Sequence, residues 1–125
     1  MLSGVCLGTN DLAKAGSFYD AVLAEIGWVR LLEGAAEIGY GPRDGWPALF
    51  IVIPFNEKAA TAGNGVQVIL RAHDQDAVDR FHAVALSQGG TDEGAPGPRD
   101  YIAGYYGAYC RDLDGNKLHA QFIPT

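Results

Sequence analysis

The chain has 125 residues, of which 48% are hydrophobic and 19% are charged, and its formal net charge is −6 at pH 7. This length and composition are typical of one globular domain with a substantial core, and they exclude a disordered or membrane-spanning chain. The acidic balance argues against nucleic acid and an anionic membrane as partners, because both bind basic surfaces.

The first part of the chain predicts a strand, a helix and three further strands. No basic segment precedes the N-terminal apolar residues, and the two cysteines, Cys6 and Cys110, both fall in expected strands. We therefore expect a reduced, cytoplasmic protein without a signal peptide. Asn10 or Asp11 caps the helix, and Gly27 ends it after an apolar stripe of helical period. The strands are expected at residues 4–9, 28–32, 36–40 and 48–54.

After a linker at residues 56–64, which is rich in Ala, Thr and Gly, the same order of elements begins again. A strand at residues 66–72 precedes a helix that Asp74 caps and that Gly89–Gly90 ends. Residues 94–100 are rich in Gly and Pro, and we expect them to form a loop that leads into a final β-hairpin.

The final hairpin turns at residues 112–116, where Asp-Gly and a following Asn supply the backbone conformations of a tight reversal. In its second strand the side chains alternate between two faces. Leu118 and Ala120 face a core, whereas His119 and Gln121 face a more polar surface. His119 is therefore expected in the middle of a sheet, on the face that no helix covers.

The two halves of the chain match each other at constant offsets. Through the first strand and helix the offset is 63 residues, so the two helix caps coincide and Gly4 falls on Gln67. In the hairpins the offset becomes 70, which places Leu49 on His119. This internal duplication predicts two βαβββ modules.

The duplication also predicts how the domain is organised. Residues 1–125 form one α+β domain, with module one at about residues 1–56 and module two at about residues 64–125. One module alone has too little buried surface to be stable, so we expect the two modules to share a continuous mixed sheet with the helices on its outside.

Three groups of residues, in this order, resemble the vicinal oxygen chelate superfamily: Asp11-Leu12 with Phe18-Tyr19 and Gly27, then Phe81-His82 with Gly89-Gly90, and then Asp112-Leu113-Asp114-Gly115-Asn116. This superfamily includes glyoxalases, extradiol dioxygenases and bleomycin-resistance proteins, and residues 78–120 look most similar to its short bacterial glyoxalase-like members. The resemblance implies paired βαβββ units that form a half-barrel around a small-molecule site, often in a dimer. It leaves the reaction open, because the fold hosts isomerases, dioxygenases and plain binding proteins.

In members of this superfamily that use a metal, four side chains bind it, one from the first and one from the last strand of each module. Carried onto this chain, the positions are Gly4, Leu49, Gln67 and His119. Gly4 has no side chain and Leu49 has no donor atom, so two neutral ligands remain, and these make a poor divalent site. A shift of one residue in the first module offers Ser3 or Phe50, which does not complete a site. We therefore expect no metal and no other cofactor.

The sheet face that carries His119 is the expected ligand site. Alternation places an apolar wall with a small polar end on this face: Cys6, Leu49, Ile51, Ile53, Gln67, Ile69 and Arg71. Arg71, in the middle of a strand, is a better candidate than Arg99 in the Gly- and Pro-rich loop for binding an anionic ligand group, because a buried arginine requires such a partner. Tyr105 and Tyr109 lie on one face of the hairpin arm and Tyr106 on the other, and alternation leaves open which of them faces the cavity.

His119 is either a general acid or base with a pKa near neutrality, or a hydrogen-bonded residue without further role. If it titrates freely, ligand binding changes between about pH 5.5 and 7.5. The missing metal ligands favour a metal-free protein that binds or sequesters a small apolar ligand. The alternatives are a glyoxalase-like lyase or isomerase acting on a small electrophile or thiol adduct, and an accessory domain that serves a partner protein. Because half-barrels expose sheet edges, we also expect a symmetric homodimer.

Overall fold

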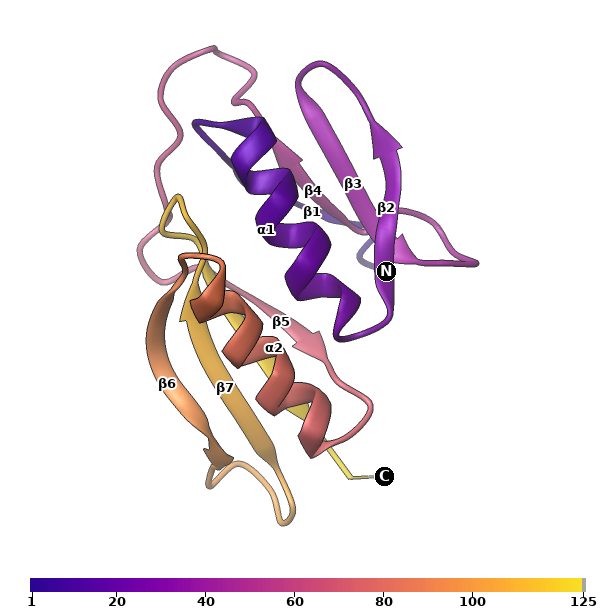
Figure 1. The fold of residues 1–125 in the computed structure, drawn as a ribbon, viewed down its shortest axis with the longest axis vertical. Helices are drawn as coiled ribbons and strands as arrows, with labels where there is room; N and C mark the ends of the chain where they lie inside the picture. The colour runs from indigo at the N-terminus through magenta and orange to yellow at the C-terminus, as the bar shows by residue number, and fades with distance from the viewer. Residues whose placement is uncertain (125) are drawn as a thin grey trace.

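Two helices lie on the same side of two four-stranded sheets in the computed structural model of this protein, which describes residues 1–124 (Figure 1). The elements of the first module are β1 (Val5–Gly8), α1 (Leu12–Ala24), β2 (Trp28–Glu33), β3 (Glu37–Pro42) and β4 (Leu49–Val52). Its sheet has the order β1-β4-β3-β2, in which β1 and β4 are parallel and the other pairs are antiparallel.

The second module repeats this arrangement, which confirms the predicted pair of βαβββ units. Its elements are β5 (Gln67–Arg71), α2 (Gln75–Ser87), β6 (Thr91–Pro98), β7 (Tyr106–Arg111) and β8 (Lys117–Phe122). The sheet order is β5-β8-β7-β6, with β5 and β8 parallel. The expected C-terminal boundary at Thr125 lies outside the described residues. No helix within residues 1–124 is long and apolar enough to cross a membrane.

Both helices begin at an aspartate whose side chain accepts a backbone hydrogen bond. The carboxylate of Asp11 accepts from Lys14 N at 3.1 Å, and that of Asp74 accepts from Ala77 N at 2.8 Å. Such caps each stabilise a helix by about 1 kcal/mol. Of the two residues proposed for the first cap, Asp11 is therefore the correct one. Asn10 binds the linker instead, through two hydrogen bonds between its side chain and the backbone of Ala60.

The expected continuous sheet is wrong, because β1 and β5 are edge strands that do not pair with each other. They line a small cavity of about 160 Å³ between the two sheets. The modules are joined instead through helix–helix contact and through side chains near the turn of the second hairpin. Asn116 donates to Gly8 O at 3.0 Å, and the backbone of Asn10 donates to Asp114 at 2.9 Å. Helix packing and side-chain hydrogen bonds thus replace a shared sheet.

Residues 94–100 are not simply a loop, because β6 continues to Pro98. The strand is the outer strand of its sheet, where proline is tolerated since one row of N–H groups has no partner strand. Two register shifts, between Asp92 and Gly94 and between Gly94 and Gly97, absorb the irregular residues. The Gly and Pro content therefore marks an irregular edge strand, and the loop that follows it begins at Arg99.

The prediction that Leu49 is the counterpart of His119 is wrong by one residue in the first hairpin, which consists of β3 and β4. Val5 pairs with Leu49 in the first module, whereas Val68 pairs with Leu118 in the second. Leu49 is therefore the counterpart of Leu118, and both are buried in the core. The counterpart of His119 is Phe50.

The cause is a longer connection in the first hairpin. Tyr40 pairs with Leu49, whereas its counterpart Cys110 pairs with Leu118, so the first connection has one residue more. The offset of 70 consequently holds for β3 and β7 but not for β4 and β8. Because side chains alternate with period 2, Leu49 and Ile51 face the core and not the open face expected for them.

Candidate functional site

His119 lies in the middle of β8, buried beneath two tyrosines on the face opposite α2. Its side chain is 3% exposed. The ring of Tyr109, its pairing partner on β7, stacks on the imidazole with centroids 4.2 Å apart and planes 28° apart. The hydroxyl of Tyr105 is hydrogen-bonded to Nε2 of His119, whereas Nδ1 is buried without a partner among the described residues. The sequence therefore placed His119 on the correct face, but the residue is covered and not at a polar surface.

Gly107 makes the contact between Tyr105 and His119 possible. A Cβ atom at this position would lie 2.9 Å from the Tyr105 hydroxyl oxygen and 3.1 Å from Nε2 of His119. Such distances are shorter than ordinary side-chain contacts. The absent side chain thus leaves a gap on the open face of β7, and Tyr105 folds back across this gap to reach the histidine.

Burial is the largest cause that lowers the pKa of His119 to about 4, and the nearby charges of Arg99 and Lys117 act in the same direction. Both cations lie over the Tyr109 ring, with Arg99 Cζ 5.5 Å and Lys117 Nζ 5.2 Å from its centroid. The imidazole is therefore neutral near pH 7. This lowered pKa moves the expected titration of His119 below the range from pH 5.5 to 7.5, because the imidazole is buried and lies near two positive charges.

The two tyrosines at His119 are also uncharged. Burial is the largest cause of the raised pKa of Tyr105 and of the raised pKa of Tyr109. The hydroxyl of Tyr109 lies 3.0 Å from that of Tyr101, and the rings of Tyr101 and Tyr105 meet edge to face at 4.8 Å. The site is thus a packed aromatic cluster of neutral polar groups.

A cavity of about 320 Å³ lies beside this cluster. Gln67 and Ile69 come from β5, and His119 and Gln121 come from β8. Ile123 follows β8, and the loop after β6 contributes Tyr101, Ile102 and Tyr105. All of these residues belong to the second module. The cavity is mainly apolar with a few polar groups, which is the usual composition of a small-molecule site.

The structure brings four of the expected site residues together, since the lining of this cavity includes Gln67, Ile69, Tyr105 and His119. The Tyr109 ring stacks on His119 and does not line the cavity. Tyr106 faces the helix side, where its hydroxyl donates to Asp79 of α2 at 2.6 Å. This settles the question left open by alternation, because Tyr105 and Tyr109 are the tyrosines on the His119 face.

Two expected site residues lie elsewhere. Arg71 is exposed on β5 and does not line the cavity, so its position requires no buried anionic partner. Cys6 is exposed on the open face of the first sheet, where it lines a separate hollow with Ile53. Ile102 was not anticipated, because it belongs to a loop whose sequence carries no alternation that could orient it.

The residues at the superfamily's metal positions do not fit a divalent ion. The corrected register places Gly4 and Phe50 in the first module, and neither offers a donor atom. In the second module, Gln67 has a neutral amide, and Nε2 of His119 is engaged by Tyr105. No group of three or more His, Cys, Asp or Glu side chains with metal-binding geometry occurs within residues 1–124.

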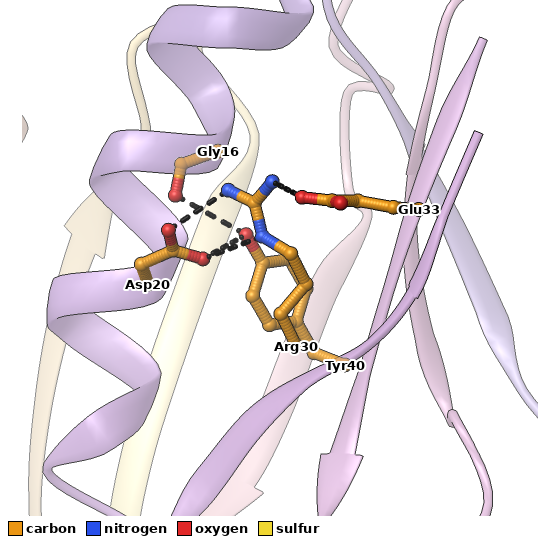
Figure 2. A network of polar contacts seen from close by, with 5 residues as sticks. All are labelled: Gly16, Asp20, Arg30, Glu33 and Tyr40. Carbon is orange, nitrogen blue, oxygen red and sulfur yellow. Dashed lines mark hydrogen bonds and ion pairs between the residues drawn. The ribbon is translucent and has the colours of Figure 1, made fainter. Parts of the chain in front are cut away.

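A second polar cluster, in the first module, was missed by sequence reasoning (Figure 2). Arg30 donates to both carboxylate oxygens of Asp20, at 3.0 and 2.8 Å, and to Glu33 at 2.5 Å. The Tyr40 hydroxyl donates to Asp20 at 2.8 Å and contacts the carbonyl oxygen of Gly16. The Asp20 carboxylate raises the pKa of Arg30. Because the guanidinium is already paired with two carboxylates, this cluster stabilises the module and leaves no unpaired cation for an anionic ligand.

Comparisons with known proteins support the fold. No protein-family model matches the chain, and no curated protein matches it in sequence. Among solved structures, a glyoxalase/bleomycin resistance protein from Albidiferax ferrireducens T118 is 37% identical, with a TM-score of 0.88 and 98% of each chain covered. A glyoxalase/bleomycin resistance protein/dioxygenase family enzyme from Burkholderia phytofirmans PsJN is 20% identical, with a TM-score of 0.76 and 98% of each chain covered. A lactoylglutathione lyase from Agrobacterium tumefaciens is 20% identical, with a TM-score of 0.67, 98% of this chain and 92% of that chain covered.

Proposed function

The chain belongs to the glyoxalase/bleomycin resistance protein family, within the vicinal oxygen chelate superfamily, and from this premise we propose that it binds a small molecule without a metal in the cavity beside His119. The observation that carries the proposal is the cavity itself. It has room for a small organic ligand, at about 320 Å³, and its wall is apolar with a few hydrogen-bonding groups. The misfit of the metal positions supports a binding mode in which side chains alone hold the ligand.

The enzymatic alternative, a glyoxalase-like lyase or isomerase, has weaker support. A general base works best when its pKa lies near the working pH, and the pKa of His119 is about 4. Nε2 is also occupied by the Tyr105 hydroxyl, so a substrate proton would have to compete with that hydrogen bond. The likeness to a lactoylglutathione lyase supports the fold and not the reaction, because the identity is 20%. A turnover assay on a bound ligand decides between the two functions.

We also propose that the protein is a homodimer. Two large apolar side chains on the loops of the first module are almost completely exposed, Trp46 at 87% and Phe55 at 103%. Each module also has unpaired edge strands, which proteins usually cover. A second copy that packs against Trp46 and Phe55 would bury both side chains in a symmetric contact.

The binding function is tested with protein that has been treated with EDTA and then freed of the chelator. A library of apolar fragments is screened by NMR, and we expect some fragments to shift the side-chain signals of His119 and Tyr105 equally before and after treatment. The variants His119→Ala and Gln67→Ala should weaken these fragments. The matched controls His73→Ala and Gln75→Ala change the same residue types at exposed positions outside the cavity and should not. The proposal would be contradicted if binding required added zinc or nickel. It would also be contradicted if no fragment in the library bound in the cavity.

A further inference from the structure

The cavity beside His119 is lined without a single ionised side chain. Its polar groups are the amides of Gln67 and Gln121, the hydroxyls of Tyr101 and Tyr105, and the imidazole of His119. The imidazole is neutral near pH 7 because burial lowers its pKa to about 4. A charged ligand would therefore lose part of its hydration and find no opposite charge in the wall, which is an unfavourable term.

The charges nearest to the cavity do not reverse this conclusion. Arg99 donates to the carbonyl oxygens of Ala95 and Pro98, at 2.7 and 3.1 Å, so its hydrogen-bonding fork is occupied. Lys117 lies over the Tyr109 ring. Both repel a cation, since both already disfavour the protonated form of His119, and both attract an anion through space. Neither lines the cavity, so an anion inside it would lack the direct ion pair that could offset its dehydration.

The apolar wall indicates the body of the ligand. Ile69 and Ile102 are each 51% exposed, although both are large hydrophobic side chains that line one cavity. The ring of Tyr101, 64% exposed, lies next to them and offers a surface for stacking. An aromatic ligand would remove these surfaces from water while keeping the edge-to-face contact of Tyr101 with Tyr105.

The two glutamines indicate the polar part of the ligand. In the β5–β8 pairing, Ile69 and His119 form the central pair, Gln67 lies opposite Lys117, and Gln121 lies opposite Arg71. The two amides therefore mark opposite ends of the cavity, roughly 13 Å apart along the strands. Each amide offers both a donor and an acceptor, which matches a neutral group that also has both.

From these features we infer that the cavity selects uncharged aromatic ligands that carry an amide-type group, and that it discriminates against anions and cations of the same shape. The inference rests on the proposed binding function and makes it specific. It differs from an apolar hollow that accepts any small molecule, because selectivity arises from the cost of bringing a charge into a neutral wall.

Three probes of nearly equal shape test the inference: benzamide, benzoate and benzylammonium. Each is titrated at pH 7 into the whole protein, with the side-chain NMR signals of His119 and Ile69 as the readout. We expect benzamide to bind, and the two ions to bind about tenfold or more weakly. Benzoate or benzylammonium binding as tightly as benzamide would overturn the ligand class and leave the binding function intact. No cavity shift with any of the three would count against both.

A variant locates the cause of the selectivity. Gln121→Glu keeps the shape of the side chain and adds one negative charge to the cavity wall, so benzylammonium should become at least as good a ligand as benzamide. Gln75→Glu makes the same chemical change at the exposed start of α2 and should leave the order of the probes unchanged. An unchanged order in Gln121→Glu would overturn the inference, because the charge of the wall would then not control the choice of ligand.

Discussion

The hydroxyl of Tyr19 in the first module donates a hydrogen bond of 2.5 Å to the buried carboxylate of Asp112 in the second. Asp112 also accepts from the side chain of Asn116 and from two backbone N–H groups of its own turn. Burial and the neighbouring carboxylate raise the pKa of Tyr19 well above its usual value. This one contact links the packing of α1 to the shape of the turn that begins β8.

Replacing Tyr19 with Phe should therefore lower the stability of the whole chain. A buried hydrogen bond to a charged group contributes about 1.5 to 3 kcal/mol, and its loss leaves part of the Asp112 carboxylate unsatisfied. The free energy of unfolding in urea measures the effect. Tyr106→Phe is the matched control, because it removes an exposed hydrogen bond to Asp79 and should cost less than about 1 kcal/mol. Equal losses in the two variants would contradict this account.

The variant Gly107→Ala should separate Tyr105 from His119. The added Cβ would meet the Tyr105 hydroxyl at 2.9 Å, so the ring must move away, at a cost of about 1 to 3 kcal/mol in stability. The His119 imidazole signals in an NMR spectrum should shift accordingly. Gly34→Ala, between β2 and β3 of the first module, serves as the control, since its nearest contact is the side chain of Glu37 at 3.6 Å. His119 signals that are the same in both variants would show that Gly107 does not hold this contact open.

Stability should fall as the pH falls from about 6.5 to 4, because of His119. In the unfolded chain the imidazole has its ordinary pKa of about 6.5, whereas in the folded protein its pKa is about 4. Between these values the unfolded state binds a proton that the folded state does not, so protonation favours unfolding. The full effect is about 3 kcal/mol at most.

This pH dependence is measured by urea unfolding of the native protein and of His119→Gln at pH 7 and pH 4.5. The variant should lose less stability than the native protein over this range. The carboxylates titrate in both proteins, whereas the His119 imidazole is present only in the native protein. The NMR titration of His119 itself should have a midpoint near 4. A midpoint between 6 and 7 would mean that the imidazole is more hydrated than its burial implies.

We expect the purified protein to carry no stoichiometric divalent metal, and ligand binding to survive treatment with EDTA. Gly4 and Phe50 supply no donors, and Gln67 and His119 bring no negative charge to offset the dehydration of a dication. Elemental analysis checks the first expectation. About one nickel, zinc, iron or manganese ion per chain, lost in His119→Ala, would refute it.

Light scattering at micromolar concentration should report a dimer. The substitutions Trp46→Asp and Phe55→Asp, on exposed loops of the first module, should shift the protein towards monomer. Leu86→Asp, on the outer surface of α2, should leave the dimer intact and thereby control for added charge. A native protein that remains monomeric at this concentration contradicts the proposed assembly.

The periodicity of the sequence predicted both modules because caps, apolar stripes and strand alternation are local signals. It placed His119 on the correct face for the same reason. The sequence-based prediction failed where a contact between residues far apart in the sequence determines the local structure. The register of β4 depends on which residues pack under α1, and so Leu49 was assigned a position that belongs to Phe50. The burial and depressed pKa of His119 depend on Tyr105, whose approach requires the empty space at Gly107.

The unequal hairpins have a practical consequence for engineering. In the first hairpin, core packing of Leu49 and Ile51 holds the strands in register, while residues 43–46 are exposed and absorb the additional length. A peptide tag or a reporter inserted there should lengthen the loop and leave the fold unchanged. The turn of the second hairpin offers no such freedom, because Asp112 and Asn116 bind each other and Asn116 also binds the first module at Gly8. One end of this pseudo-symmetric protein is thus an insertion site, and the equivalent end is not.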